Sequence, residues 1–314
     1  MALVVCRWKP FYVSNDNDLI TGNAVSYNLS YEFEDNRGNG GLMANTLNEQ
    51  ERKVIAQYTG FPEGERLTYT KAHQTEFIVT MHYLHRFLTP GAKIADIGAG
   101  GGTYTNALAE EGYDVDAVEL TPEYVKQMQE RFAGNDHIRV FEGNAKDLSF
   151  LDDNVYDLVL LMGPIYSIKD FEDRKRACKE ALRIAKPGAP IFIAFCLQDA
   201  PLVHEIFMAE DPVHELTQVG YDRERAIVTD NTGSSRLLDT IAVVDELIDT
   251  VCAEYDARKV CRFAQDGLSE VIRSSVNTMS EEAYAEWIQY LIATAERTDL
   301  MGYSDHVVQV IELQ

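Results

Sequence analysis

Between about residue 70 and residue 197, short apolar runs alternate with segments in which apolar residues recur every three or four positions. The spacing of Phe77, Met81, Leu84 and Leu88 predicts a helix over 70–88, and Thr89-Pro90-Gly91 ends it. The expected strands are 94–97, 114–120, 138–142, 156–162 and 190–197, and the expected helices between them are 103–111, 121–134 and 170–185. Strands that alternate with helices in this way indicate a doubly wound, parallel α/β sheet.

The pattern changes after residue 197. Leu237, Ile241, Val244 and Ile248 follow helical spacing, and the chain closes with strand-like alternation from His306 to Leu313. We therefore predict a seven-stranded, mostly parallel Rossmann-like sheet with an antiparallel C-terminal strand. The expected parts are an N-terminal extension (1–50), a Rossmann-like cofactor-binding core (51–230), a helical cap insertion (231–302) and the final strand of the core sheet (303–314).

The first strand of this core leads into a glycine-rich turn. Ile94 to Ile97 is apolar apart from Asp96, glycines occupy positions 98, 100, 101 and 102, and the segment from Thr103 is compatible with a helix. A turn without side chains lets a ligand approach the backbone, and free N–H groups at a helix start favour electron-rich groups. Glu119 ends the next strand, where an acid can accept hydrogen bonds from both hydroxyls of a ribose. The glycine-rich turn and Glu119 alone do not distinguish NAD(P) from other adenosine ligands.

Three further features narrow the choice. The turn reads GxGGG, whereas dinucleotide-binding proteins more often show GxGxxG. Gly143-Asn144-Ala145 follows the third strand, where a polar side chain and a backbone N–H can read the adenine edge. Leu160 to Tyr166 ends the fourth strand through Gly163-Pro164, and Lys186-Pro187-Gly188 precedes the fifth strand.

Together these residues resemble the class I S-adenosylmethionine-dependent methyltransferases, over about residues 70–200 and with a late strand that extends to the C-terminus. The resemblance is greatest to bacterial small-molecule-type members, which carry GNAxDL and GPLYHL stretches and a near-terminal GxSxH segment. The corresponding segments here are Gly143-Asn144-Ala145-Lys146-Asp147-Leu148, Gly163-Pro164-Ile165-Tyr166-Ser167-Ile168 and Gly302-Tyr303-Ser304-Asp305-His306. Ser167 stands where such relatives often carry His, a departure that removes the imidazole from that position.

The resemblance implies a role for each matched position. Asp96 would orient the turn and the methionine amino group, Glu119 would bind the ribose, and Asn144 would meet the adenine. The residues expected at the cofactor are Tyr69, Asp96, Gly98, Ala99, Gly100, Gly102, Glu119, Leu120, Asn144, Ala145, Met162 and Gly163. Tyr69 belongs to this set because the segment before the first core helix often folds over the cofactor in this class.

Methyl transfer from a sulfonium depends mainly on in-line positioning of the acceptor, which can supply on the order of 7–11 kcal/mol in the best intramolecular cases. A base is required only when the acceptor must lose a proton. Tyr166, directly after the fourth strand, and His306, at the mouth of the last strand, are the candidate catalytic residues; packing and hydrogen bonding are the alternatives for them. We expect no metal, because His82 and His85 share a helix face without a nearby carboxylate pattern.

The amino-acid composition limits which partners and which cellular compartment are expected. With 28 Lys and Arg against 51 Asp and Glu, the net charge of −23 would repel phosphates, which disfavours nucleic acid. Five scattered cysteines without a CxxC pair favour a reducing cytoplasm. We expect no signal peptide and no membrane span, because no stretch approaches the roughly 20 apolar residues that a span needs. For the N-terminal extension three alternatives stay open: a hairpin that covers a site, a segment that mediates contacts in a homodimer, or a loosely ordered arm.

We therefore predict a cytoplasmic S-adenosylmethionine-dependent methyltransferase that moves a methyl group to a small-molecule or peptide-derived acceptor by in-line displacement. Two alternatives stay open. One is a non-catalytic protein that binds S-adenosylmethionine, and the other is an NAD(P)-dependent oxidoreductase. The sequence does not distinguish O-, N-, S- and C-methylation.

Overall fold

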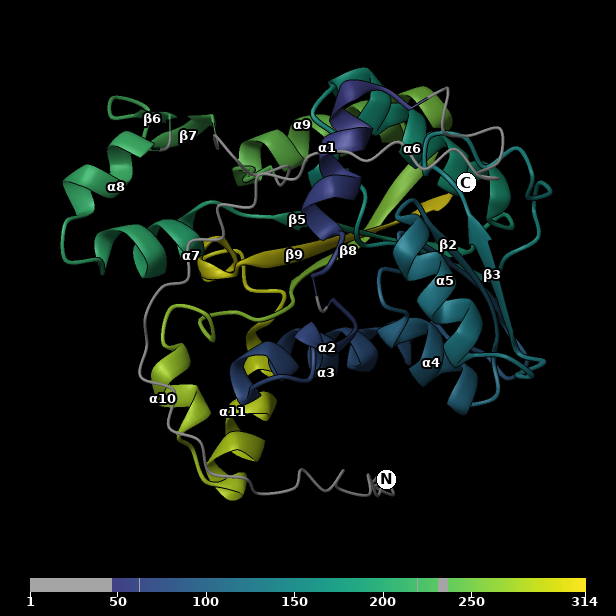
Figure 1. The fold of residues 1–314 in the computed structure, drawn as a ribbon, viewed down its shortest axis with the longest axis horizontal. Helices are drawn as coiled ribbons and strands as arrows, with labels where there is room; N and C mark the ends of the chain where they lie inside the picture. The colour runs from purple at the N-terminus through teal and green to yellow at the C-terminus, as the bar shows by residue number, and fades with distance from the viewer. Residues whose placement is uncertain (1–46, 62, 219, 231–236) are drawn as a thin grey trace. The chain divides into compact units, whose positions relative to one another are not determined.

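The computed structural model describes residues 47–61, 63–218, 220–230 and 237–314 (Figure 1). Seven strands in this part of the chain form one sheet in the order β3-β2-β1-β4-β5-β9-β8. The strands are β1 (Lys93–Ile97), β2 (Asp114–Glu119), β3 (Ile138–Glu142), β4 (Leu158–Leu161), β5 (Pro190–Cys196), β8 (Ala257–Ala264) and β9 (His306–Leu313). The strands from β3 to β5 pair in parallel, and β9 is antiparallel to both β5 and β8. The predicted mostly parallel sheet with an antiparallel C-terminal strand is confirmed.

Helices cover both faces of this sheet (Figure 1). The longer helices are α1 (Glu49–Tyr58), α3 (Lys71–Leu84), α4 (Thr103–Glu110), α5 (Pro122–Arg131), α6 (Phe171–Ile184), α8 (Pro212–Gln218), α9 (Ile241–Tyr255) and α11 (Glu281–Thr294). The short elements are α2 (Glu63–Arg66), η1 (Ile165–Ser167), α7 (Asp199–Pro201), η2 (Leu202–Phe207), β6 (Gly220–Asp222), β7 (Ile227–Asp230), α10 (Arg273–Asn277) and η3 (Met301–Tyr303).

Strand alternation divides the apolar core into one cluster on each face of the sheet. Ala95 and Ile97 of β1 belong to a cluster with α6 and α9, whereas Ile94 belongs to a cluster with α3, α4 and α11. Every residue of β4 and β5 is buried, as expected of parallel strands with helices on both sides. No helix in the described ranges is long and apolar enough to cross a membrane.

The prediction of a helical cap insertion over residues 231–302 is wrong in part, because this range supplies a strand and a helix to the core. β8 forms an edge of the sheet, and α9 packs against α6 over one face. Charged side chains hide the strand pattern of β8: Arg258 pairs with Glu312, and Arg262 pairs with Asp245. Such charges suit an edge strand, which must not pair further. Among the described residues of this range, α10 and α11 pack against α3 and lie outside this strand and helix.

The N-terminal extension predicted for residues 1–50 falls outside the described residues up to position 46, and α1 begins within its last residues. The strand order reverses between β1 and β4, so the carboxyl ends of these neighbours flank a crevice. The loops that follow β1, β2, β3 and β4 meet at this edge of the sheet, where the candidate residues gather.

Candidate functional site

The turn between β1 and α4 is built from glycines in left-handed conformations. The angle φ is +78° at Gly98 and +76° at Gly102, values that residues with a Cβ adopt only under strain. The turn folds back on β2, because the N–H groups of Gly98 and Ala99 donate to the Val118 carbonyl at 2.8 and 3.1 Å. A Cβ added to Gly98 would lie 2.5 Å from Cδ of Pro164. Gly98 is therefore where the β1 and β4 loops touch.

Glu119 ends β2 and reaches across this turn. Its carboxylate accepts hydrogen bonds from the Gly100 N–H at 2.9 Å and from the Thr121 N–H at 2.8 Å. Glu119 is only 7 % exposed, and burial raises its pKa even though these hydrogen bonds lower it. The Glu119 carboxylate therefore helps to fix the backbone conformation of the glycine turn.

Asp96 lies beneath the turn. Its Oδ2 accepts a hydrogen bond from the Thr105 hydroxyl at 2.7 Å, which ties β1 to the first turn of α4. Burial raises the pKa of Asp96 to about 6, against the lowering effect of the Thr105 hydrogen bond. Asp96 therefore holds the turn from below and does not line the cavity above it.

A cavity of about 390 Å³ lies above the turn. The residues predicted for the cofactor that line this cavity are Gly98, Gly100, Glu119, Leu120, Asn144, Ala145 and Gly163. Tyr166, a predicted catalytic residue, lines it as well. The loops after four strands therefore converge on one cavity, in the place where the sequence motifs fall.

Four residues predicted for the cofactor lie outside the cavity lining, besides Asp96. Ala99 and Met162 pack against the apolar cluster on the α3 side of the sheet, and Gly102 packs against α5. Tyr69 is 77 % exposed and meets the ring of His73. The prediction that Tyr69 lines the cofactor cavity differs from the structure, because the segment before α3 turns this side chain into solvent.

The helices α1 and α2 form a wall of the cavity that was not foreseen from the sequence. The lining residues that they supply include Gln50, Glu51, Val54, Tyr58 and Glu63. The far end of α1 is held on α5, where the Tyr124 hydroxyl donates to the Tyr58 carbonyl at 2.7 Å. The signal available in the sequence was the capping box, in which Asn48 and Glu51 each accept a hydrogen bond from the other's backbone N–H.

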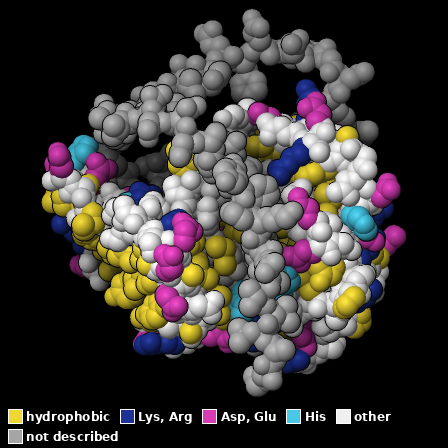
Figure 2. All heavy atoms as spheres, turned by 90° about the horizontal axis from the view of Figure 1, so that it is seen from below, with side chains coloured by type: hydrophobic (Ala, Val, Ile, Leu, Met, Phe, Trp, Pro, Cys, Tyr) yellow, Lys and Arg dark blue, Asp and Glu magenta, His cyan; other side chains and the backbone are white. Residues whose placement is uncertain are grey.

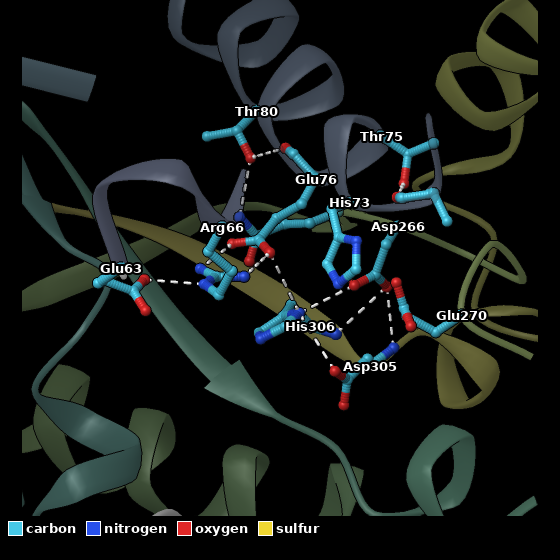
Figure 3. A network of polar contacts seen from close by, with 12 residues as sticks. Glu63, Arg66, His73, Thr75, Glu76, Thr80, Asp266, Glu270, Asp305 and His306 are labelled. Atoms are coloured by element: carbon cyan, nitrogen blue, oxygen red, sulfur yellow. Dashed lines mark hydrogen bonds and ion pairs between the residues drawn. The ribbon is translucent and has the colours of Figure 1, made fainter. Parts of the chain in front are cut away.

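A chain of buried and half-buried polar contacts runs from this wall to β9 (Figure 3). Arg66 of α2 donates to Glu63 at 2.8 Å and to Glu76 of α3 at 2.6 Å. Glu76 lies 3.6 Å from Nδ1 of His306, and Asp266 lies 2.8 Å from the same nitrogen. The network therefore connects the cavity lining with the carboxyl end of β8 and the start of β9.

These contacts favour the imidazolium form of His306. Burial lowers the pKa of His306, but the carboxylates of Glu76, Asp305 and Asp266 raise it well above its ordinary value. The structure brings the two predicted catalytic residues together, with the rings of Tyr166 and His306 edge to face at 6.4 Å between centroids. Tyr166 lines the cavity and His306 does not. An imidazolium cannot accept a proton, so His306 is not a base in this state.

Glu76, Asp266 and His306 also offer one potential metal-ligand atom each, all within 4.8 Å of one another. In the described structure, positive partners already neutralise both carboxylates, because Arg66 binds Glu76 with two nitrogens and His306 binds Asp266. Ion pairing accounts for the arrangement of this cluster.

Comparison with known families identifies the part of the chain that carries the glycine turn and the strand ends beside it. Residues 95–193 match the family model described as a methyltransferase domain. This stretch is a methyltransferase domain. It spans the parallel strands from β1 to β5 and contains all the predicted cofactor residues except Tyr69. The predicted family is thereby confirmed for these residues, and Glu63, Asp266 and His306 lie outside the methyltransferase domain.

Curated relatives match part of this chain at modest identity. A demethylmenaquinone methyltransferase of Clavibacter sepedonicus is 32 % identical over 114 residues, which cover 36 % of this chain and 45 % of the relative. A ubiquinone biosynthesis O-methyltransferase of Xanthomonas campestris is 30 % identical over 110 residues, which cover 35 % of this chain and 45 % of the relative. The matches thus span less than half the length of these relatives.

Solved structures of methyltransferases are similar to this chain over a larger share of its length. An S-adenosylmethionine-dependent methyltransferase from Aquifex aeolicus aligns with a TM-score of 0.47 and 14 % identity, over 82 % of this chain and 98 % of the other. One from Methanosarcina mazei aligns with a TM-score of 0.47 and 16 % identity, over 74 % and 96 %.

Proposed function

We propose that this chain is an S-adenosylmethionine-dependent methyltransferase that acts on a small-molecule or peptide-derived acceptor. The observation that carries the proposal is the convergence of the Gly98–Gly100 turn, Glu119 and Asn144 on one cavity of the methyltransferase domain. Two relatives named for demethylmenaquinone and for ubiquinone biosynthesis support a small molecule as the acceptor.

The side chains around the cavity favour a ligand with positive charge. The acidic lining residues are Glu49, Glu51, Glu63, Glu119, Asp170 and Asp173, and the basic ones are Lys146 and Lys169. Lys146 is already paired with both Glu51 and Asp173. S-adenosylmethionine carries an ammonium and a sulfonium, whereas NAD(P) presents a pyrophosphate that carboxylates repel. The lining therefore fits S-adenosylmethionine better than the cofactor of an oxidoreductase.

Each lining group has a task that suits its chemistry. Glu119 would hold the ribose hydroxyls, and Asn144 would meet the adenine. Gly98 and Gly100 let the ligand approach the backbone, and Glu63, kept in place by its ion pair with Arg66, offers a carboxylate to the ammonium. When bound, S-adenosylmethionine supplies an electrophilic methyl group on a positively charged sulfur.

Tyr166 is the lining residue that we assign to the acceptor. Burial raises the pKa of Tyr166 well above its ordinary value, so its hydroxyl stays protonated and can donate a hydrogen bond. His306, an imidazolium against the Tyr166 ring, would support this side chain and would not remove a proton. The chain therefore favours an acceptor that is nucleophilic as it binds or that loses its proton to solvent.

Isothermal titration calorimetry tests the cofactor directly. S-adenosylhomocysteine and S-adenosylmethionine are titrated separately into the full chain, with NADH titrated into the same preparation as the control. We expect both sulfur ligands to bind and NADH to give no heat of binding. Binding of NADH without binding of either sulfur ligand would instead support the oxidoreductase.

Turnover separates the enzyme from a non-catalytic binder. The full chain is incubated with S-adenosylmethionine and fractions of a small-molecule extract, and S-adenosylhomocysteine is followed by mass spectrometry. We expect its formation to depend on particular fractions, in which the methylated product is then identified. A chain that binds the cofactor but yields no S-adenosylhomocysteine with any fraction would be the non-catalytic alternative.

The distribution of charged side chains on the surface indicates which class of partner the chain can bind. On the face shown in Figure 2, the Lys and Arg side chains of the described residues lie scattered among acidic ones and form no basic stripe. Together with the net charge of −23, this supports a partner other than nucleic acid. The homodimer and the cytoplasmic location stay predictions, and light scattering on the purified chain is the measurement for the dimer.

A further inference from the structure

The first half of α1 connects two rims of the cavity. On one rim, Glu51 contacts the side chains of Asn144 and Lys146, which follow β3. On the other, the Gln50 amide donates to the Ser167 carbonyl, after β4, at 3.2 Å. The helix therefore closes the cavity at the level of Asn144, the residue assigned to the adenine.

The contacts of Asn144 determine the positions of Oδ1 and Nδ2 in its side-chain amide. Nδ2 lies 2.7 Å from Oε1 of Glu51, and Oδ1 lies 3.1 Å from the backbone nitrogen of Lys146. A carboxylate only accepts hydrogen bonds and a backbone N–H only donates, so the two partners require this orientation and oppose the flipped one. With one hydrogen on Glu51, Nδ2 keeps a second hydrogen for another acceptor.

Glu51 is itself held from several sides. Its carboxylate accepts from the Asn48 N–H at 2.7 Å, and the Lys146 ammonium lies 3.0 Å from it and 2.6 Å from Asp173. Burial raises the pKa of Glu51, but the hydrogen bonds from Asn48, Lys146 and Asn144 lower it further, to below its ordinary value. Glu51 is therefore an ionised acceptor at neutral pH, and the Asn144 amide cannot rotate without losing a charged partner.

We propose that Glu51 is a positioning residue of the cofactor site, which acts through Asn144 by presenting Nδ2 as a hydrogen-bond donor to N1 on the Watson–Crick edge of adenine. This inference rests on the proposed function. At that edge N1 of adenine accepts a hydrogen bond, whereas N1 of hypoxanthine carries a hydrogen and would oppose the donor. Glu51 thus becomes a determinant of base selectivity, although it lies outside the methyltransferase domain.

The test compares two ligands that differ only in the base, S-adenosylhomocysteine and S-inosylhomocysteine. Calorimetry on the wild-type chain should show tighter binding of the adenosyl ligand. Glu51→Ala removes the charged one of the two partners that orient the Asn144 amide, so we expect the adenosyl ligand to bind about tenfold more weakly and the inosyl ligand to change less. Glu51→Gln keeps an oxygen that can accept from Asn144 and should recover most of the selectivity.

A matched control lies on the same helix. Lys53 forms an exposed ion pair with Glu49 and does not line the cavity, so Lys53→Ala should leave both affinities unchanged. The far end of α1 stays anchored in all of these variants, because Gly60 donates to Glu123 at 3.0 Å and Tyr124 binds the Tyr58 carbonyl.

A paired exchange gives the sharpest result. In the double variant Glu51→Gln/Asn144→Asp the amide and the carboxylate trade places, so the group that faces the base becomes an acceptor. A carboxylate that faces N1 meets the lone pair of adenine but accepts from the N1–H of hypoxanthine, so we expect the preference to turn toward S-inosylhomocysteine, an outcome that loosening of α1 cannot produce.

The outcomes are distinct. An equal loss of both ligands in Glu51→Ala, with no reversal in the double variant, would overturn the positioning role and leave α1 as a structural wall. Unchanged selectivity in every variant would overturn it as well. A wild-type chain that binds neither ligand would contradict the proposed function itself, before Glu51 is considered.

Discussion

The Glu119 carboxylate accepts a hydrogen bond from the Gly100 N–H at 2.9 Å, so the acid at the end of β2 supports the turn at the end of β1. One side chain thus has two tasks. It fixes the glycine backbone and leaves further lone pairs on its oxygens for a ligand. Glu119 and the glycine turn, which are apart in the sequence, are therefore in direct contact in the site.

Replacing Glu119 should weaken cofactor binding. Glu119→Ala removes the ribose acceptor and the partner of Gly100, and we expect roughly 1–3 kcal/mol of lost binding free energy for S-adenosylhomocysteine. Calorimetry at neutral pH measures it, with Glu119→Gln as the variant that keeps one acceptor oxygen. An unchanged dissociation constant in Glu119→Ala would refute the ribose assignment.

The buried Asp96 should make stability depend on pH. Its pKa rises from the ordinary 3.8 to about 6 in the fold, so the folded state favours the neutral carboxyl. The resulting stabilisation is full below the unfolded pKa and is lost as the pH rises through the folded one, about 3 kcal/mol in all. Asp96→Asn keeps an acceptor for Thr105 and lacks this titration.

Urea unfolding of wild type and Asp96→Asn measures this effect as a difference, so that the other titrating groups largely cancel. The advantage of Asp96→Asn should grow with pH, and roughly half of the full change should fall between about pH 5 and pH 7. A difference that does not vary with pH would mean that Asp96 titrates normally in the folded chain.

The part of the site predicted from the sequence is the part with local signals. Asp96, Gly98 and Glu119 each follow from a strand end read within a few residues, and parallel strands bring such ends to one edge. Asn144 and Gly163 also follow strand ends, the resemblance gives both a place at the cofactor, and they line the same cavity. Periodicity and turn chemistry suffice for these positions.

The rest depends on tertiary contacts that no local pattern encodes. Arg66 and Glu76 pair with each other and reach His306 only because α2, α3 and β9 pack together. The strand β8 was hidden by charges such as Arg262, whose partners lie on α9 and β9. Glu51 had a capping signal, but its contact with Asn144 could not be foreseen from it.

Gly98 should tolerate no side chain. In Gly98→Ala the new Cβ would lie 2.5 Å from Pro164 at a φ of +78°, so both a clash and backbone strain oppose it. Gly134→Ala is the control, since Gly134 has a φ of +82° and no atom within 4 Å of the added Cβ. We expect a loss of about 1–2 kcal/mol in unfolding free energy for Gly134→Ala and a larger loss for Gly98→Ala. Equal losses of unfolding free energy in the two variants would show that the β4 loop moves away from the new Cβ at little energetic cost.

Asp266 should control the ionisation of His306. In Asp266→Asn the imidazolium loses its closest carboxylate, and breaking one partner of a buried pair typically costs about 3–5 kcal/mol. Because the pKa of His306 is raised, its stabilisation is full below the unfolded pKa and is lost as the pH rises through the folded value. The destabilisation by Asp266→Asn should therefore be largest near pH 6 and shrink in alkaline buffer.

Titration of the histidine resonances by NMR should show a lower pKa for His306 in this variant, while exposed His137 serves as the internal control. An unshifted pKa of His306 would contradict the network.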